Sequence, residues 1–416
     1  MINTLQKNIY ALLTVQFANY ILPLITVPYL AHVLGVYAFG RIAFAQAVAQ
    51  YFVVLADFGF NLSATRQVSL IRDSPLKISL LFSEVLTIKI LLMLSGFLLL
   101  LALNSIIQSF SSNARLIEIS YLSVLGNVLF PVWLFQGLER MRYITIYTVT
   151  ARLISVVAIF VLVNNKQDIY VAAALQSGAG VLGGVFALIG AFYVTELRFQ
   201  IPTFKNLMRA VLETWPIFLS NAAITLYTST NIIVVGLMTT PAVVGYFSAA
   251  DKIVRASINA ITPISQAVYP RIVSLVSTSH ASAFRFLNRL LKWQGAGTLA
   301  ISLALLLFSR PITLDLLGPQ FIKSVSVLKC MAFLPLFIGL SNVLGIQTML
   351  AFNMKRVFSG IITRCGIVNI AILVPLIALY GADGAAISVL TTEIAVTLCM
   401  AYVLYRASIL QKIIQG

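Results

Sequence analysis

The chain has 416 residues, of which 60% are hydrophobic and 10% are charged, and its formal net charge is +16. Together with a mean hydropathy of +0.98, this composition excludes a sizeable soluble domain and predicts a polytopic membrane protein. Lys and Arg in cytoplasmic loops account for such a balance in a membrane protein, so the charge does not indicate nucleic acid as a partner. The cysteines and histidines lack the spacing of a metal site, and we expect neither a metal nor a disulfide.

The sequence predicts twelve apolar segments, each long enough for a transmembrane helix, which needs about 20 residues. In chain order they lie near 8–34, 42–65, 78–103, 114–136, 143–163, 169–194, 210–238, 243–269, 290–309, 325–352, 357–380 and 384–405. Most of the Lys and Arg residues between the segments fall on one side of the membrane if both termini are inside. By the positive-inside rule, this asymmetry predicts cytoplasmic N- and C-termini. The predicted fold class is an all-α membrane protein with twelve transmembrane helices.

A weak internal repeat divides the chain into halves. The turn around Gly40 corresponds to the turn around Gly245, and Asn127-Val128-Leu129 recurs as Asn342-Val343-Leu344. Two six-helix halves of the same orientation would form a parallel repeat, with ligand sites at their interface. We therefore predict two pseudo-symmetric lobes around a central cavity. The predicted lobes are residues 1–198 and 210–416, joined by a cytoplasmic linker at 199–209.

Segments 1, 2, 7 and 8 occupy equivalent positions in the two halves, and each carries unusual polarity. On segment 2 the polar residues share one helical face, and Arg41 opens that helix on a different face. The polar positions of segments 1, 2 and 7 are Gln16, Asn19 and Thr26 of segment 1, Gln46, Gln50, Asp57 and Asn61 of segment 2, and Asn221, Thr225, Thr228 and Asn231 of segment 7. The alternative for the uncharged residues is interhelical hydrogen bonding, which contributes about 0.6 kcal/mol each. We predict that these segments line the cavity.

Segment 8 has the clearest polar face, because its polar residues recur at spacings of three and four and Lys252 lies beside them. The face comprises Ser248, Asp251, Arg255, Asn259, Thr262 and Gln266. Charges inside a membrane cost about 2.5–3.5 kcal/mol each on insertion scales, so they usually face a bundle interior or a water-filled cavity. The alternative is that Asp251 and Arg255 form an ion pair that only supports helix packing, but this pair would leave Lys252 unneutralised.

Other charged residues within the apolar segments are expected to be structural. Lys89 and Glu84 of segment 3 are predicted to lie close enough to the membrane interface for their side chains to snorkel. Signatures of enzymes are absent from the sequence: it has no paired-carboxylate motif, no acyltransfer motif, no phosphate-binding loop and no nucleophile elbow. We therefore expect that the protein is not an enzyme.

Three stretches carry a resemblance to a known family. They are Asp57-Phe58-Gly59-Phe60-Asn61-Leu62-Ser63-Ala64-Thr65, the stretch from Pro131 to Met141 with the letters PVWLFQGLERM, and the two parts of segment 8, Ala249 to Ile253 and Pro263 to Arg271. With these stretches the whole chain resembles the Wzx-type O-antigen flippases of Gram-negative bacteria. Those are polysaccharide transporters of the multidrug/oligosaccharidyl-lipid/polysaccharide exporter superfamily. The WLFQGLERM part is the most specific.

The resemblance implies two six-helix lobes in the bacterial inner membrane and a substrate, an oligosaccharide repeat unit on undecaprenyl pyrophosphate. It also implies partners in the lipid bilayer and in O-antigen assembly, such as a polymerase and a chain-length regulator. A pyrophosphate-linked sugar needs a hydrated, cationic chamber. Arg255 and Lys252 are the first candidates for the pyrophosphate and Arg41 the third. Asn259, Gln46, Gln50, Asn221 and Asn19 are the candidate polar contacts to the substrate.

Asp57, and after it Asp251, are the candidates for binding a proton or Na⁺ that couples the transport cycle, and no other cofactor is expected. The alternative function is a cation-coupled multidrug exporter of the same superfamily. That function predicts a cavity of carboxylates and aromatic residues, whereas base and acid are about balanced in segment 8. A polymerase or ligase would need a long periplasmic loop with catalytic groups, which the sequence lacks.

Overall fold

The computed structural model describes the backbone of residues 2–195, 197–259 and 262–415. Side chains are described for these residues except 2–21, 194–195, 220, 223–224, 226–228, 262–264, 266–267 and 415. Every regular element in the described part is a helix. The chain divides into two compact units, Met1–Ser229 and Thr230–Gly416, so that helix α10 (Phe204–Met238) begins in the first and ends in the second. The lobe boundaries given above stay a prediction.

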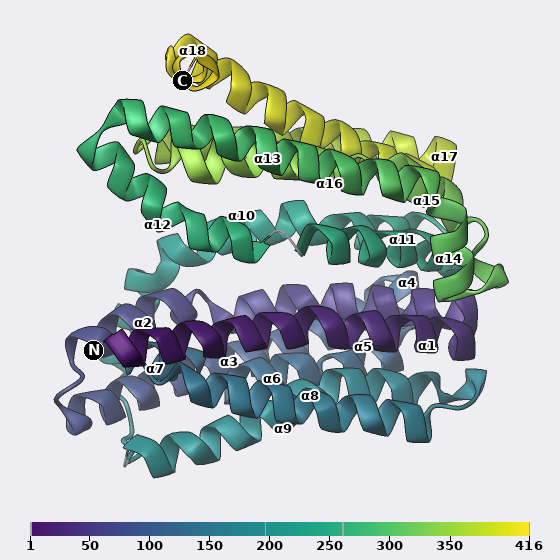
Figure 1. The fold of residues 1–416 in the computed structure, drawn as a ribbon. Helices are drawn as coiled ribbons and strands as arrows, with labels where there is room; N and C mark the ends of the chain where they lie inside the picture. The colour runs from purple at the N-terminus through teal and green to yellow at the C-terminus, as the bar shows by residue number, and fades with distance from the viewer. Residues whose placement is uncertain (1, 196, 260–261, 416) are drawn as a thin grey trace. The chain divides into compact units, whose positions relative to one another are not determined.

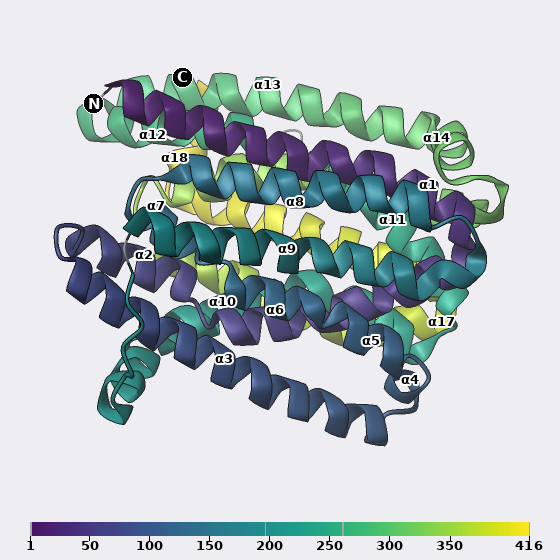
Figure 2. The same ribbon diagram turned by 90° about the horizontal axis from the view of Figure 1, so that it is seen from below.

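The first unit is built from α1 to α9 and most of α10 (Figure 1). Its helices before α10 are α1 (Ile2–Asp57), α2 (Phe60–Leu70), α3 (Pro75–Ile106), α4 (Gln108–Ser111), α5 (Ala114–Ser120), α6 (Leu122–Leu129), α7 (Val132–Gly137), α8 (Met141–Leu162), the short 3₁₀ helix η1 (Lys166–Asp168) and α9 (Ile169–Thr195). Helix α9 packs against both α6 and α8, and α1 packs against α8 (Figure 2).

The second unit has the remaining helices (Figure 1). They are α11 (Pro241–Asn259), α12 (Thr262–Thr278), α13 (His280–Leu307), α14 (Ser309–Leu317), the 3₁₀ helix η2 (Pro319–Phe321), α15 (Ser324–Met331), α16 (Leu334–Ser341), the π-helix η3 (Asn342–Met349), α17 (Lys355–Arg406) and α18 (Ile409–Gln415). Helix α13 packs against α16, and α11 and α17 both pack against α15.

Each of the twelve predicted segments falls on helix, but the breaks between helices are not always where the sequence suggested. The turn predicted at Gly40 lies at Gly35, whose φ of 75° interrupts α1. The break in α17 lies at Gly381, between the last two predicted segments. Eight helical stretches in the described part are long and apolar enough to cross a membrane, and among them Leu22–Leu70 and Lys355–Arg406 contain an internal break. The count of twelve crossings stays a prediction.

The family-specific stretches form much of one hydrophobic core in the first unit. Trp133, Leu134 and Phe135 of α7 are buried there together with Phe60 of α2 and Phe82 of α3. Burial of each such side chain removes a large apolar surface from its surroundings and fixes the helices against one another.

Helix α2 packs against α7 beside this core. The Thr65 hydroxyl lies within hydrogen-bonding distance of the Trp133 carbonyl and the Gln136 side-chain oxygen, 3.3 Å from each. Two of the stretches that resemble the family thus pack against each other as α2 and α7, and α2 begins three residues after Asp57.

The segment predicted as a linker, 199–209, contains the start of α10. Residues 197–203 have no helix, and α10 begins at Phe204. The non-helical part is held on α3, because Ser79 and Ser83 accept hydrogen bonds from the amides of Arg198 (3.2 Å) and Gln200 (2.9 Å). Side-chain acceptors therefore satisfy backbone donors of this segment.

Candidate functional site

The first polar site begins where α1 stops. Asp57 is the last residue of α1, and the next two residues have positive φ, 50° at Phe58 and 84° at Gly59. Glycine suits this conformation because it lacks a Cβ. It also suits the packing, since a Cβ on Gly59 would lie 2.8 Å from a side-chain carbon of Ile217. The chain therefore turns from α1 into α2 with the Asp57 carboxylate at the turn.

A lysine from a neighbouring helix neutralises this carboxylate. Nζ of Lys89, in α3, lies 3.2 Å from Oδ1 of Asp57 and 3.2 Å from the carbonyl oxygen of Asn127. The Lys89 side chain is 2% exposed and the Asp57 side chain 14%. The ammonium group thus donates to both a carboxylate and a main-chain carbonyl, in a place with almost no access for solvent or lipid.

The sequence explains why the Asn127 carbonyl is available to Lys89 and is not bonded to a backbone amide of its own helix. In a regular helix it would accept a hydrogen bond from the amide four residues later, but that residue is Pro131, which has no N–H. Helix α6 ends at Leu129 with the Phe130 amide bonded to the Gly126 carbonyl at 3.1 Å. Pro131 therefore leaves an acceptor inside the helix bundle, and Lys89 satisfies it.

Lys89 is the residue that the sequence interpretation missed, and the prediction that it snorkels is wrong. It is the fifteenth residue of α3, which places it about 21 Å along the axis from the start of the helix. Its burial in the structure agrees with a position deep within the bundle. Two features of the sequence could have predicted the position of Lys89. A helix that starts at Pro75 places Lys89 deep along that helix, and a proline at 131 leaves the Asn127 carbonyl available as its acceptor.

The second polar site is on α11. Nε of Arg255 donates to Oδ2 of Asp251 at 2.7 Å, an i,i+4 ion pair on one helix. The Asp251 side chain is 9% exposed and that of Arg255 51%. The pair proposed as the alternative interpretation is therefore present. The Arg255 side chain is half-exposed in this pair, and a role in substrate binding stays a prediction for Arg255, Lys252 and Asn259.

The other predicted substrate residues are dispersed in the first unit. Nε of Arg41 donates to Oδ1 of Asn113 at 2.8 Å, and its Nη2 donates to the Ser112 carbonyl at 3.1 Å, so it joins α1 to the turn before α5. The Gln46 amide donates to the side-chain oxygen of Gln176, on α9, at 3.1 Å. In this unit Asp57 forms an ion pair with Lys89, whereas Arg41 bonds to Asn113 and Ser112.

The remaining polar candidates are less constrained. Gln50 is exposed and Asn221 is half-buried. The side chain of Asn19 lies outside the described residues. The predicted meeting of segments 1, 2, 7 and 8 around one cavity stays a prediction.

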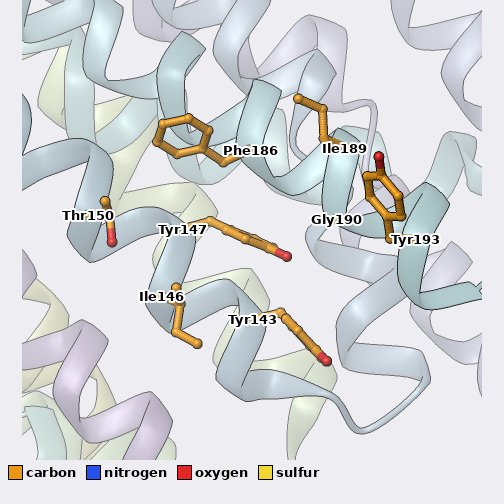
Figure 3. Close-up of a pocket in the computed structure, with 8 residues that line it drawn as sticks. All are labelled: Tyr143, Ile146, Tyr147, Thr150, Phe186, Ile189, Gly190 and Tyr193. Carbon is orange, nitrogen blue, oxygen red and sulfur yellow. The ribbon is translucent and has the colours of Figure 1, made fainter.

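A shallow groove between α8 and α9 is a separate feature (Figure 3). It has a volume of about 510 Å³ and a mainly apolar lining, with no charged side chain among the described residues that form it. The lining residues are Tyr143, Ile146, Tyr147, Thr150, Phe186, Ile189, Gly190 and Tyr193. None of the predicted substrate residues lies here, and the groove lacks the cations that a pyrophosphate requires.

The described residues contain no group of three His, Cys, Asp or Glu side chains that could hold a metal ion. The three cysteines are free thiols. Cys365 is buried, but Cys399 is exposed.

Comparisons with known proteins place the chain in a family. The family model described as "Polysaccharide biosynthesis protein" matches residues 5–276. A protein of Escherichia coli (strain K12) described as "Putative O-antigen transporter" is 34% identical over 397 residues, covering 95% of this chain and 96% of that protein. A protein of Shigella dysenteriae with the same description is 32% identical over 402 residues, covering 95% and 99%.

Membrane transporters are among the solved structures that resemble this fold. An inward closed conformation of the lipid II flippase MurJ superposes with a TM-score of 0.75 at 15% identity, covering 98% of this chain and 90% of that one. An inward-facing multidrug resistance transporter of the MATE family gives a TM-score of 0.63 at 14% identity, covering 94% and 99%. At these identities the likeness concerns the fold alone.

The helices of the chain and its relatives agree on the type of protein. The described part has several helices apolar enough to span a membrane, and the relatives are named as transporters and not as enzymes. The protein is a multi-pass membrane protein, and it belongs to the polysaccharide biosynthesis protein family of transporters.

Proposed function

We propose that the protein is a flippase for lipid-linked oligosaccharides. It moves O-antigen repeat units on undecaprenyl pyrophosphate from the cytoplasmic to the periplasmic leaflet of the bacterial inner membrane. The observation that carries this proposal is the 34% identity to an E. coli protein described as "Putative O-antigen transporter", because the match extends over 95% of the chain. The fold shared with a lipid II flippase supports a lipid-linked substrate.

The chemistry of the substrate fits the charges inside the helices. The sugars and the pyrophosphate cannot enter hydrocarbon, because their polar groups would lose hydration without gaining partners. Arg binds phosphate oxygens through paired N–H groups and Lys binds them as a point charge. Arg255 keeps half of its side chain exposed while paired to Asp251, so it is the first candidate for the pyrophosphate, with Lys252 beside it.

We further propose that two lobes rock alternately to open the substrate site to each side, and that a cation moving in the opposite direction drives the cycle. Repeat-built transporters work in this way. Asp57 and Asp251 are the candidate ion-coupling carboxylates. Both are ion-paired, to Lys89 and to Arg255, so any coupling ion competes with a basic side chain.

A multidrug exporter is the second candidate, favoured by the fold shared with a MATE transporter. The two functions are separated by one pair of assays in the same cells. A strain that lacks its own O-antigen transporter should regain surface polysaccharide and lose accumulated lipid-linked intermediates when it expresses this chain. Restored resistance to cationic drugs without restored polysaccharide would instead establish the exporter.

A further inference from the structure

Two interrupted helices end at the same point in the first unit. Helix α1 ends at Asp57 and α6 ends at Leu129, and Asn127 near the end of α6 has a carbonyl that Pro131 cannot satisfy. The C-terminal end of a helix carries a partial negative charge of about half an electron. Unwound carbonyls and helix C-termini are the groups with which transporters coordinate Na⁺ or protons. A carboxylate and a carbonyl at such ends have the chemistry of a site for a hard monovalent cation.

The structure shows which cation fills this position. Nζ of Lys89 lies 3.2 Å from the Asp57 carboxylate and 3.2 Å from the Asn127 carbonyl. We propose that Lys89 is a tethered cation, that is, a side-chain ammonium that occupies the ion site. By occupying it, Lys89 excludes Na⁺ and K⁺ from Asp57. The inference deepens the proposed function, because it concerns which ion can couple transport at this site.

The second unit offers an internal comparison. Gln294 is the fifteenth residue of α13, as Lys89 is of α3. Its side chain is also buried, at 8% exposure, and it also donates to a main-chain carbonyl of another helix, that of Gly339 in α16, at 3.0 Å. A neutral amide is therefore sufficient to satisfy such a carbonyl. The positive charge of Lys89 is needed for the carboxylate of Asp57.

The site also retains what an incoming ion would need. The Asp57 side chain is 14% exposed, so a small ion can reach it once the ammonium leaves. Two amide oxygens belong to residues that flank the site, Asn127, whose main-chain carbonyl binds Lys89, and Asn61, which follows Asp57 in the chain; both Oδ1 atoms are buried and accept no hydrogen bond among the described residues. These oxygens are of the type that hard cations prefer. Loss of the lysine charge should therefore create a metal-ion site where the native protein has none.

The alternative is a purely structural ion pair. Buried pairs can often be replaced by neutral groups of similar size without functional change. A structural pair predicts that neutralising Lys89 changes stability only. The tethered-cation proposal predicts a new property, namely Na⁺ binding that depends on Asp57. The two interpretations therefore differ in a measurement of ion binding.

The test is the binding of radioactive Na⁺ to purified full-length protein in detergent. The wild type should show no Na⁺ binding that depends on Asp57. Lys89→Gln, which introduces the residue type found at the fifteenth position of α13, should gain saturable Na⁺ binding that the wild type lacks. The double variant Asp57→Asn/Lys89→Gln should lose this gain. Lys89→Arg keeps the charge and is the matched control, which should bind like the wild type.

Two results would overturn the proposal. One is saturable Na⁺ binding by the wild type that the double variant lacks. The other is a folded Lys89→Gln protein, verified by size-exclusion chromatography and thermal unfolding, that gains no Na⁺ binding. Lys89→Met is the second neutral replacement should the glutamine variant fail to fold. The single variant Asp57→Asn is avoided, because it would leave a buried ammonium without its carboxylate.

The binding assay is independent of transport. Failure of the wild-type chain to restore O-antigen would overturn the proposed function and would leave the ion-binding result intact. Failure of Lys89→Gln to bind Na⁺, with O-antigen restored by the wild type, would overturn only the tethered cation.

Discussion

At the scale of single residues, the two ion pairs inside the helices have different architectures. Asp251 and Arg255 are four residues apart on one helix, and the cation is 51% exposed. Asp57 and Lys89 come from different helices, and the cation is 2% exposed. The first pair follows from helical periodicity alone. The second depends on how α1 and α3 pack, so it required the tertiary structure.

The first prediction concerns Arg255. If it binds pyrophosphate, Arg255→Lys should keep part of the transport activity and Arg255→Gln very little, because lysine retains the charge but loses the paired N–H geometry. Truncating one partner of a buried charge pair costs about 2–5 kcal/mol, and the half-exposed guanidinium puts this pair at or below the low end. Surface O-antigen in a transporter-deficient strain is the measurement, with membrane expression checked for each variant.

The double variant Asp251→Asn/Arg255→Gln is the control for this prediction. It removes the charge of Asp251, whose side chain is 9% exposed in the native pair and which Arg255→Gln alone deprives of its guanidinium partner. We expect no recovery of transport, because the phosphate would still lack its partner. Recovery close to the wild-type level would instead assign Arg255 to the neutralisation of Asp251.

At the scale of helices, interruptions position the polar groups. The break after Asp57 places a carboxylate at a helix end, and Pro131 frees the Asn127 carbonyl one helix away. In the second unit the corresponding Asn342 lies at the start of a π-helix, and its side-chain oxygen accepts a hydrogen bond from Ser265 at 2.8 Å. The repeated Asn thus meets different partners in the two units, although both lie at an irregular stretch of helix.

The second prediction tests the break after Asp57. Gly59→Ala should destabilise the protein by about 1–2 kcal/mol for the left-handed conformation alone. The close contact with Ile217 should add to this loss. The matched control is Gly178→Ala on α9, where a Cβ meets nothing within 4 Å and where alanine favours helix by about 0.5–1 kcal/mol. Thermal unfolding in detergent should show a lower midpoint for Gly59→Ala and an equal or higher midpoint for the control.

An unchanged midpoint for Gly59→Ala would mean that the turn tolerates a side chain. The break would then not be what fixes Asp57 against Lys89. Loss of stability in both variants would point to a general sensitivity of glycines in this unit.

At the scale of the whole molecule, orientation in the membrane is the property that the charge pattern predicts and that no contact within the fold decides. Lys166 lies in η1 and is exposed, and Ser277 lies near the end of α12 and is exposed. With both termini cytoplasmic, Lys166 belongs to the periplasmic side and Ser277 to the cytoplasmic side.

The third prediction uses single cysteines at these two positions. After replacement of Cys330, Cys365 and Cys399, a cysteine at 166 should react with a membrane-impermeant thiol reagent added to intact cells, and a cysteine at 277 should not. Position 277 leaves intact the nearby Ser279, which caps α13 by accepting a hydrogen bond from the Ser282 amide. The opposite labelling pattern would reverse the predicted orientation.

The sequence by itself determined the class of protein, the helical nature of each segment, the family and the i,i+4 pair on α11. These properties depend on composition, on local periodicity and on short stretches of residues, which are present before the chain folds. The tertiary structure alone decided the partner of Asp57. Lys89 is 32 positions away in the chain, and its apolar stem on an apolar helix is equally compatible with snorkelling and with burial. Only the packing of α3 beside α1 and α6 withdraws the ammonium from solvent and places it on the carboxylate and on the carbonyl that Pro131 leaves free.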